Sequence, residues 1–501
     1  MKKTTPALSY EVAPLEPGRT QFAFAFEAIE KAERAGVFRA LDRHLSLSMK
    51  RYDYSVIDKL KTLWLSIVIG CDHTKEINTR LGTIEPDLAA RLGLRRFPDQ
   101  SGINRLLTRL DSTSIDEVRA AHFQILTANT RARDRSRWLR LPGGRRLLVV
   151  DFDQRALVVR GKKYELAEKG FFGRKRGRRG YQLSLAYLGG AVGEVLDEHL
   201  DPGSTHAGAR VETMLEATAR FVQALGLRPD EVLIRADAQY GTPVIVKMIE
   251  ARGFHYLIKG ISPQRARVLS RAVGEQAVFD LAGHPEGTER RWMTDLGLVA
   301  HAAAGRRQEA VTIEARTLFG VWVHEVPSSG TPLNAATRAR RRAAGTLTRR
   351  QVAPEYWLTS LEAEDLPAPA AVEIYNERVT IESYFRDEQQ ALGARHVRTK
   401  SHGGEAVFEW LVALANNVLK WMREATFAGT VVETLGLKRL VKEVLSLPAA
   451  VQRTADSIIV RLPSQTGIIR LLSASWKPLL SLHESSQNQQ LSRDRRGTSG
   501  P

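Results

Sequence analysis

The chain has 501 residues, of which 43% are hydrophobic, enough to fill the cores of roughly three domains. Its 74 lysines and arginines outnumber its 56 acidic residues and give a net charge of +18, which favours a polyanionic partner such as nucleic acid. The single cysteine, Cys71, excludes internal disulfides and a thiolate-based zinc site, and it indicates a reducing compartment. We therefore expect a folded cytoplasmic protein with access to DNA.

No segment of the sequence has the length of a transmembrane helix. The longest apolar run, residues 63–71, is about half of the ~20 residues that a membrane span needs. The first 18 residues, MKKTTPALSYEVAPLEPG, contain two lysines but no apolar segment behind them, so they do not resemble a secretory signal. We expect neither a membrane partner nor secretion.

The N-terminal part has the pattern of short helices. Apolar residues recur with helical spacing over 22–32 and 56–70, and polar capping residues precede the stretches 101–111 and 114–126. We expect a helical domain over residues 1–140 that serves DNA binding or dimerisation. The segment 78–94 is a candidate for a recognition helix, although many helical bundles without DNA-binding activity show the same pattern.

Strand patterns begin after a basic linker at 131–146. The expected order is three strands, a helix, a strand, a helix and a strand, at residues 147–153, 155–161, 181–190, 211–225, 232–237, 242–253 and 255–260. A helix at 369–392 would complete this layout, which predicts an α/β fold with helices flanking a mixed sheet. This order is the one found in ribonuclease H-like nucleases, so we expect a ribonuclease H-like catalytic core that begins with residues 141–260.

The remaining segments divide by pattern. Residues 261–365 contain strand-like runs and aromatic residues, and they predict a mainly β insertion because structureless loops of this length are uncommon. Residues 366–425 would form the second part of the core, followed by a largely helical C-terminal region at 426–484. The polar composition of residues 485–501 is typical of a disordered tail.

Three acidic positions follow or face the predicted strands. Asp153, or alternatively its neighbour Asp151, ends the first strand, Asp237 follows the strand at 232–236, and Glu382 lies on the helix at 369–392. The carboxyl ends of strands in an open α/β sheet are where a crevice forms. Carboxylate oxygens bind hard cations such as Mg²⁺, and two such ions ~3.5–4 Å apart can activate the attacking oxygen and stabilise the leaving oxygen of a phosphodiester. We therefore expect these acids to be catalytic and to bind metal.

The helix at 369–392 carries a polar stripe beside its apolar face. Counting 100° per residue from Tyr375, Arg378 lies at about 300° and Glu382 at about 340° on a continuous helix. This placement can direct Glu382 into a crevice and Arg378 towards a phosphate. The alternative is an ordinary surface ion pair between Arg378 and Glu382, worth about 0.3–0.5 kcal/mol.

Basic residues cluster in segments that we expect to contact DNA. Besides Tyr375 and Arg378, the candidates are Arg386, Arg160, Lys162, Lys163, Arg174, Lys175, Arg176, Arg178, Arg179, Arg338, Arg340, Arg341 and Arg342. Any single cluster of this kind is equally typical of a solvated loop.

The sequence resembles a known family at several of these positions. Residues 375–382, YNERVTIE, match the Tyr-x2-Arg-x3-Glu signature of the DDE transposases of bacterial insertion sequences, which belong to the ribonuclease H-like and retroviral integrase superfamily. Residues 234–241, IRADAQYG, are similar to their second-Asp motif. Residues 151–161, DFDQRALVVRG, followed by 178–188, RRGYQLSLAYL, are similar to their first-Asp strand, and the interval from Asp153 to Arg160 and Gly161 is also found in the piggyBac group.

This resemblance implies a DNA transposase. It implies a metal-dependent enzyme, with two Mg²⁺ ions per site or Mn²⁺ in their place. Such an enzyme binds terminal inverted repeats of double-stranded DNA, cleaves the element ends and joins their 3′-hydroxyl groups to target DNA by cut-and-paste transposition. It further implies a homodimer on DNA and a bacterial, nucleoid-associated protein. The competing hypotheses are a ribonuclease H-fold endonuclease without strand transfer and a non-catalytic DNA-binding protein derived from a transposase.

One position departs from the family signature. The signature continues to a lysine seven residues after the glutamate, where this chain has Gln389, whose neutral amide cannot supply a charge to a phosphate. Arg386, one turn from Glu382, and the basic cluster at 395–401 are the candidates to replace that lysine.

Overall fold

The computed structural model describes residues 18–49, 53–170, 172, 177–273, 279–280, 289–305, 308–327, 335–344, 348–453, 458–463 and 467–473. The contacts within the chain divide it into two compact units. The first, called the terminal unit, comprises residues 1–121 and 387–501, and the second, the central unit, comprises residues 122–386. Each unit is described by itself.

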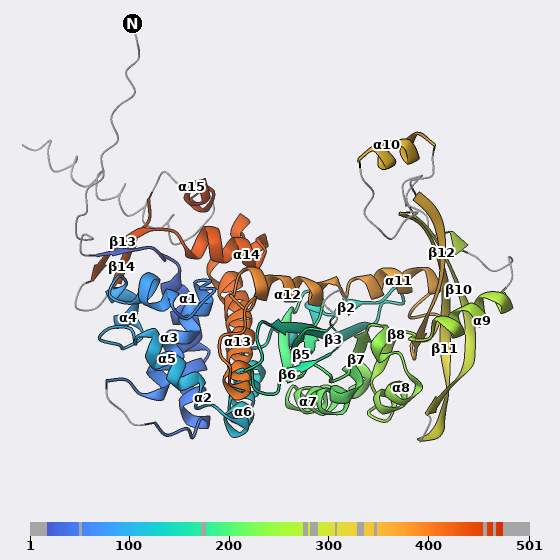
Figure 1. The fold of residues 1–501 in the computed structure, drawn as a ribbon, viewed down its shortest axis with the longest axis horizontal. Helices are drawn as coiled ribbons and strands as arrows, with labels where there is room; N and C mark the ends of the chain where they lie inside the picture. The colour runs from blue at the N-terminus through green and yellow to red at the C-terminus, as the bar shows by residue number, and fades with distance from the viewer. Residues whose placement is uncertain are drawn as a thin grey trace, which may run out of the picture. The chain divides into compact units, whose positions relative to one another are not determined.

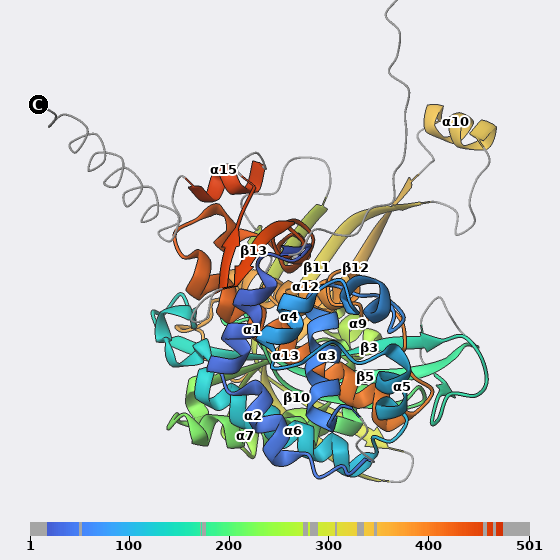
Figure 2. The same ribbon diagram turned by 90° about the vertical axis from the view of Figure 1, so that its left-hand side faces the viewer.

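The terminal unit is built around the long helix α13, His402–Phe427, most of whose residues are buried. Helices α1 (Ala25–Arg34), α3 (Val56–Val68) and α5 (Gln100–Leu107) pack on α13, as Figure 2 shows. The unit also contains α2 (Val37–His44), η1 (Ile77–Leu81), α4 (Pro86–Arg91), η8 (Val431–Thr434), α14 (Leu437–Arg439), η9 (Leu440–Leu445), α15 (Gly467–Ser473) and a small sheet of β1 (Arg19–Thr20), β13 (Ala449–Arg453) and β14 (Ile458–Arg461). Helix α6, Ser112–Asn129, leads into the central unit.

The central unit is organised by one large mixed sheet. Its main path runs β4 (Glu168–Lys169), β5 (Arg179–Leu188), β3 (Arg146–Val159), β7 (Val232–Ala236), β8 (His255–Lys259), β12 (Thr348–Thr359), β11 (Gln308–Pro327), β10 (Glu289–Gly305) and β9 (Phe279–Asp280). Two further strands pair beside this path, β2 (Leu139–Arg140) with β3 and β6 (Glu194–Pro202) with β5. Strands β3, β7 and β8 are parallel to one another, whereas the other pairs are antiparallel.

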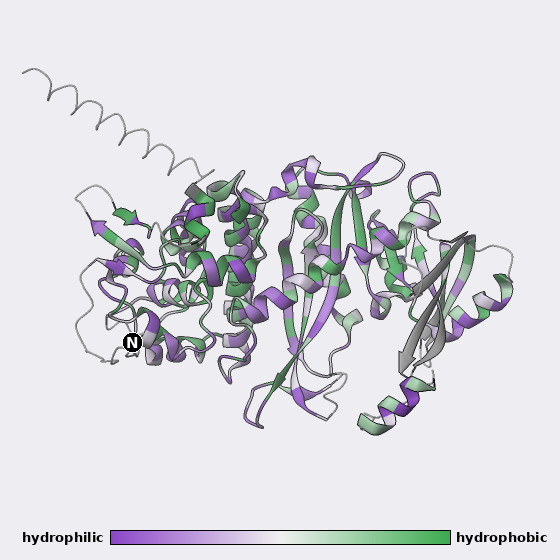
Figure 3. Cartoon of the chain, turned by 90° about the horizontal axis from the view of Figure 1, so that it is seen from above, coloured by the Kyte–Doolittle hydropathy of each residue, from purple (hydrophilic) through white to green (hydrophobic). Residues whose placement is uncertain are grey.

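Helices cover the sheet of the central unit. Figure 1 shows α7 (Val211–Ala224) and α8 (Pro243–Glu250) along one side of the strands, and α11 (Ala368–Asn376) and α12 (Val379–Gln390) along the other. Strands β3, β5 and β7 are buried along most of their length, as expected of strands covered on both faces. Apolar residues follow these strands in Figure 3. Helices α9 (Pro263–Val273) and α10 (Ala335–Ala343) and the short turns η2 (Arg131–Arg133), η3 (Arg135–Arg137), η5 (Ala207–Arg210), η6 (Pro229–Glu231) and η7 (Ala238–Tyr240) complete the unit.

The expected order of strands and helices is present, with two differences in how it is composed. The stretches predicted as separate strands at 147–153 and 155–161 form one strand, β3, because residues 150–159 all pair with β5. The strand β6, which had not been predicted as a core strand, supplies the third strand before α7. The long strands of the 261–365 segment do not form a separate sheet, because β12 pairs with β8 and continues the sheet.

The prediction of a single helix at 369–392 is wrong. The structure has two helices, α11 and α12, separated by a turn at Glu377 and Arg378. At this turn the Arg378 amide donates to the Tyr375 carbonyl at 3.1 Å, a spacing of three residues rather than four. A short tightened turn inside a helical segment is often found at a functional position.

The division into units differs from the domain boundaries expected at residues 140 and 425. Helix α13, assigned from the sequence to the catalytic core, packs with the N-terminal helices in the terminal unit. The candidate recognition segment 78–94 contains only the turn η1 and the six-residue helix α4. Residues 485–501 lie outside the described residues, so their predicted disorder stays a prediction. Across the ranges that the structure describes, none of the helices is both long and apolar enough to span a bilayer.

Candidate active site

The pairing of β3 with β7 places two of the predicted acids next to each other. In this parallel pair Phe152 lies opposite Ala236, so Asp153 and Asp237 are the next residues along the two strands. The Asp153 side chain is 13% exposed, and Asp237 is partly buried. Burial, and then the negative charge of Asp153, raise the pKa of Asp237 above its ordinary value, which reflects how close the two carboxylates lie.

A tight turn fixes the position of Asp237. Its Oδ1 atom accepts a hydrogen bond of 2.9 Å from the Gln239 amide at the start of η7. The turn then passes against the end of β8, where a Cβ atom on Gly241 would lie 1.9 Å from the Lys259 carbonyl oxygen. Glycine is therefore required at this close approach, and the sequence DAQYG encodes both the cap and the packing of the turn.

The alternative first aspartate, Asp151, is fully buried in an ion pair. The Arg235 side chain donates from Nε and Nη2 to its two carboxylate oxygens at 2.8 and 2.9 Å, and both side chains have no exposed surface. A Cβ atom on Gly189 would lie 2.3 Å from Asp151 Oδ2, so only glycine leaves space for the pair. With both oxygens occupied by an arginine, Asp151 is a structural residue in this arrangement, and Asp153 is the better candidate for the first catalytic acid.

The same arginine stabilises the break between α11 and α12. In a continuous helix the Ile374 carbonyl would accept from the Arg378 amide, but that amide donates to Tyr375 instead. Arg235 Nη1 donates to the vacated Ile374 carbonyl at 2.6 Å. The buried pair of Asp151 and Arg235 thereby ties β3 and β7 to the end of α11 and sets where α12 begins.

Arg378, in the turn between the two helices, lies between two of the predicted acids. Its Nη1 donates to Asp153 Oδ2 at 2.8 Å, and its Nη2 is 3.7 Å from Glu382 Oε1. Burial lowers the pKa of Arg378, but the charge of Asp153, its hydrogen bond and the neighbouring Tyr375 and Asp151 together raise the pKa above its ordinary value. The Arg378 side chain is 11% exposed whereas Glu382 is 62% exposed, so the predicted surface ion pair exists as one half of a bridge to Asp153.

Two tyrosines border these charges. Tyr375 packs edge-on against Trp357, with ring centroids 6.0 Å apart, and burial raises its pKa to about 12. Tyr240, at the end of the DAQY turn, is buried, and its hydroxyl has no hydrogen-bond partner in the part of the chain that the structure describes. Burial, followed by the charges of Asp153 and Asp237, raises the pKa of Tyr240. A buried hydroxyl without a partner beside two carboxylates is a feature often found where a ligand or water completes the site.

A cavity of about 780 Å³ adjoins the second acid. Gln239, whose amide donates to Asp237, lines it together with Gln154, Gln182, His206 and Met248, among other residues. Neither Asp153 nor Asp237 lines the cavity itself, which borders the turn that follows Asp237.

The three acids are of the type that binds a divalent cation, but their side chains do not surround one common position. Asp153, Asp237 and Glu382 supply carboxylate oxygens, the ligands that Mg²⁺ and Mn²⁺ prefer, and the partnerless Tyr240 hydroxyl marks unused hydrogen-bonding capacity beside them. Among the described residues, however, no three histidine, cysteine or acidic side chains lie close enough to hold one ion. Arg378 occupies the position between Asp153 and Glu382, which explains the separation of these two side chains.

Two further acids, both on β6, have partners within the unit. Asp197 contacts His199 at 3.0 Å, and Asp201 binds the Arg210 guanidinium.

The predicted DNA-binding residues fall into three groups. Exposed side chains that project from the central unit are Arg160, Lys162, Lys163, Arg178, Arg338, Arg340, Arg342 and Arg386, and Arg341 is partly buried. Arg179 is engaged with the Ala167 carbonyl, to which its Nε donates at 3.0 Å. Arg174, Lys175 and Arg176 lie outside the described residues.

The candidates to replace the signature lysine differ in exposure. In the cluster at 395–401, Arg398 is partly buried and donates to the carbonyls of Cys71 and Gly393, whereas Arg395 and Lys400 are exposed. Arg386 is exposed on the same helix as Glu382, and its Nη2 donates to Ser383 at 3.1 Å. Arg386 and the exposed part of the cluster therefore both stay candidates to meet a phosphate.

Sequence reasoning missed two residues of the site. Arg235 lies within the quoted IRADAQYG motif, and a charged residue inside a buried strand is a signal that a buried partner exists. Tyr240 follows Asp237 by three residues in the same motif, but its lack of a hydrogen-bond partner depends on packing and has no counterpart in the sequence.

An acid-lined edge of a mixed sheet, with an arginine between the carboxylates, is the arrangement expected of a metal-dependent enzyme that acts on phosphodiesters, here a transposase of the DDE class. Residues 28–483, nearly the whole chain, match the model of the transposase DDE domain group 1, and the chain belongs to this family. The family implies a metal-dependent DNA-cleaving enzyme and DNA as its partner, and the mixed sheet with its helices is compatible with a ribonuclease H-like core. A comparison with curated proteins finds no match.

Proposed function

We propose that this transposase binds the terminal inverted repeats of an insertion sequence, cleaves the DNA at the element ends and joins the freed 3′-hydroxyl groups to target DNA by a cut-and-paste route. The observation that carries the proposal is the register of β3 and β7, which brings Asp153 and Asp237 together at the end of a parallel pair, beside Arg378 and Glu382. The proposal places the chain in the Tyr-x2-Arg-x3-Glu branch of the insertion-sequence transposases, with a relation to the piggyBac group.

In this proposal Asp153, Asp237 and Glu382 bind two divalent cations, Mg²⁺ or Mn²⁺. When bound, such ions polarise the phosphodiester and lower the pKa of the attacking water. The raised pKa of Asp237 supports this role, because two neighbouring carboxylates that repel each other favour a positive charge between them.

Arg378 would change partners when DNA and cations bind. In the described structure its guanidinium neutralises Asp153 and contacts Glu382. A cation that takes over the charge of these two carboxylates leaves the guanidinium available to a DNA phosphate, which arginine binds with two parallel hydrogen bonds. Tyr375 lies next to Arg378 and would orient its guanidinium towards the phosphate.

The basic residues of the central unit supply the contacts with the DNA backbone. The exposed lysines and arginines at 160–163 and the four arginines of α10 lie on segments with little or no buried surface, as expected of residues that bind phosphates by charge alone. Cutting and joining two ends requires two active sites, so we propose a homodimer on DNA.

The test is cleavage of labelled duplexes taken from the two flanks of the reading frame, in the presence of Mg²⁺ or Mn²⁺. The wild-type chain should cut these ends, and Asp153→Asn, Asp237→Asn and Glu382→Gln should each lose activity while keeping the wild-type thermal unfolding. Glu373→Gln is the matched control, since Glu373 is an exposed acid on α11 outside the site. Full activity in the three acid variants would overturn the proposal.

The two alternative functions give different results in the same assay. With a supercoiled plasmid as target, a transposase yields joined products, whereas a nuclease without strand transfer yields only cut ends. A non-catalytic DNA-binding protein binds the duplexes and cuts none of them with either metal.

A further inference from the structure

Helix α5 of the terminal unit has one buried face and one polar face. Gly102, Ile103, Leu106 and Leu107 are buried, and the helix packs on α3 and α13. The packing against α13 is close, since a Cβ atom on Gly404 would lie 2.0 Å from the Leu107 carbonyl oxygen. The position of α5 is therefore fixed by backbone contacts rather than by adaptable side chains.

The outer face of α5 carries side chains that recognise DNA bases. Its exposed residues are Ser101, Asn104 and Arg105, and Thr108 and Arg109 in the turn that directly follows the helix continue their spacing of three and four residues. Arginine pairs with guanine and asparagine with adenine through two hydrogen bonds each in the major groove. A helix about 10–12 Å across fits that groove, which is about 12 Å wide.

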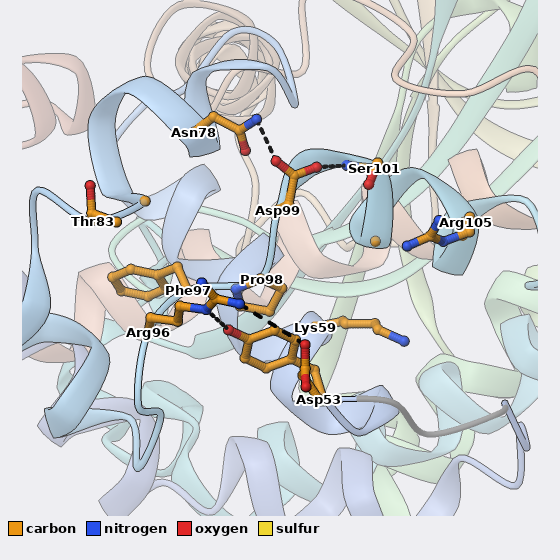
Figure 4. A pocket seen from close by; sticks show the side chains of 13 residues that line it. Asp53, Lys59, Asn78, Thr83, Arg96, Phe97, Pro98, Asp99, Ser101 and Arg105 are labelled. Carbon is orange, nitrogen blue, oxygen red and sulfur yellow. Dashed lines mark hydrogen bonds and ion pairs between the residues drawn. The ribbon is translucent and has the colours of Figure 1, made fainter.

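The start of α5 is held by a second segment. Asp99 caps the helix by accepting from the Ser101 amide at 2.7 Å, and Asn78 donates to the other oxygen of Asp99 at 2.7 Å. The Asn78 carbonyl oxygen also accepts from the Gln100 amide at 2.9 Å. Figure 4 shows Asn78, Asp99 and Ser101 in this arrangement. Asn78, the first residue of the segment 78–94, thus holds the start of α5.

A cavity of about 400 Å³ beside the start of α5 is lined by three cationic side chains and by the two acids Asp53 and Asp99. Lys59, Arg96 and Arg105 all reach it, together with Tyr54 and Phe97 (Figure 4). Arg96 is engaged, since its Nε donates to the Tyr54 hydroxyl at 3.1 Å and its Nη2 lies 4.0 Å from Asp53.

Lys59 and Arg105 have no such partner. Within the described ranges neither forms an ion pair with a carboxylate, and they lie close enough for the charge of Arg105, after burial, to lower the pKa of Lys59. Two cations that repel each other at the edge of a cavity favour a bound anion between them. A phosphate of the DNA backbone, which borders the major groove, is such an anion.

We propose that α5 is the helix that reads the terminal sequence in the major groove of double-stranded DNA, and that Lys59 and Arg105 bind a backbone phosphate at the cavity beside it. The inference rests on the proposed function, since it assigns the surface by which the same protein recognises its element ends. Asn104 and Arg109 then contact base edges, and Lys59 and Arg105 fix the register of the helix on the duplex.

The test measures the affinity of the full chain for duplexes from the flanks of the reading frame and for random-sequence duplexes, over a series of salt concentrations. Lys59→Met and Arg105→Met should weaken binding to both kinds of duplex and reduce the slope of log affinity against log salt by about 0.9 each. Asn104→Ala and Arg109→Ala should reduce the preference for the flanking sequence by about fivefold or more. Arg39→Met, which removes an exposed arginine from α2, is the matched control for charge.

Each outcome separates the inference from the proposed function. If the wild-type chain binds and cuts the flanking duplexes but the four variants behave like Arg39→Met, the inference is wrong and the proposed function stands. The same conclusion follows if Asn104→Ala and Arg109→Ala leave the sequence preference unchanged, or if the wild-type chain binds single strands as tightly as duplexes. A wild-type chain that binds no DNA overturns both. Thermal unfolding of each variant identifies any loss that comes from misfolding.

Discussion

Strand β3 carries two aspartates, Asp151 and Asp153, and each pairs with an arginine from another element. The two pairs differ in their burial. Asp151 and Arg235 are both fully buried and joined by two hydrogen bonds, whereas Asp153 and Arg378 keep 13% and 11% of their side chains exposed and are joined by one. Arg235 has a further partner in the Ile374 carbonyl, whereas Arg378 has the exposed Glu382. The comparison shows that a shared pairing pattern does not give a shared role, since one pair stabilises the fold and the other remains accessible to ligands.

The largest expected effect is a loss of stability when the buried pair of Asp151 and Arg235 is broken. Asp151→Asn leaves the buried Arg235 guanidinium with only the exposed Glu377, whose Oε2 is 3.9 Å from its Nη1, as a countercharge, which should lower the free energy of unfolding by about 3 kcal/mol. Denaturant unfolding of the purified variant measures this loss. A variant as stable as the wild type would mean that Asp151 is not the structural member of the two aspartates.

The second effect is on catalysis at the accessible pair. Asp153→Asn should lower the rate of DNA cleavage by about 10²–10³-fold or more, the usual cost of removing one charged group from a catalytic site. Its free energy of unfolding should change by about 1 kcal/mol or less, because the repulsion from Asp237 is relieved when the Arg378 pair is lost. Cleavage rates and denaturant unfolding on one preparation test both statements, and a large loss of stability with normal cleavage would reverse the two roles.

The Tyr240 hydroxyl lies near the accessible acids and has no partner among the described residues. Tyr240→Phe should therefore raise the free energy of unfolding by about 1 kcal/mol in the absence of divalent cations and DNA, because a buried unsatisfied hydroxyl is removed. Tyr256→Phe is the control with the opposite sign, since the Tyr256 hydroxyl donates to Glu250 at 2.8 Å and its loss should destabilise the protein. Equal destabilisation by both changes would show that Tyr240 has a partner in solution.

The smallest expected effect is a pH dependence of stability. The pKa of folded Asp237 lies above its ordinary value, so between the two values the folded state binds a proton that the unfolded state does not. The contribution of this residue to the free energy of unfolding should therefore become more favourable as the pH falls through the folded pKa. Asp237→Asn should remove that contribution, which unfolding curves of the two proteins at a series of pH values without divalent cations can measure. A difference that does not change with pH would mean that the pKa of Asp237 is ordinary.

Much of the fold and part of the site follow from short-range patterns. The alternation of buried strands and amphipathic helices predicts β7, α7, α8 and β8 within a few residues, because the burial of one helix face or of a whole strand fixes the spacing of apolar residues. The same patterns place Asp153 and Asp237 at the ends of strands. They do not predict the unit to which α13 belongs, since its residues were assigned to the second part of the core.

By itself the sequence determined the candidates for the site: three separated acids, an arginine four residues before the last of them, and basic segments around them. Only the tertiary structure showed that Asp151 is held by a buried arginine whereas Asp153 stays partly exposed, because Arg235, which pairs with Asp151, is 84 residues away in the chain. The break before α12 was decided in the same way, since the Arg235 side chain satisfies the carbonyl that the break exposes. Local patterns record which face of an element is buried, whereas the partner of a buried charge is set by contacts between distant parts of the chain.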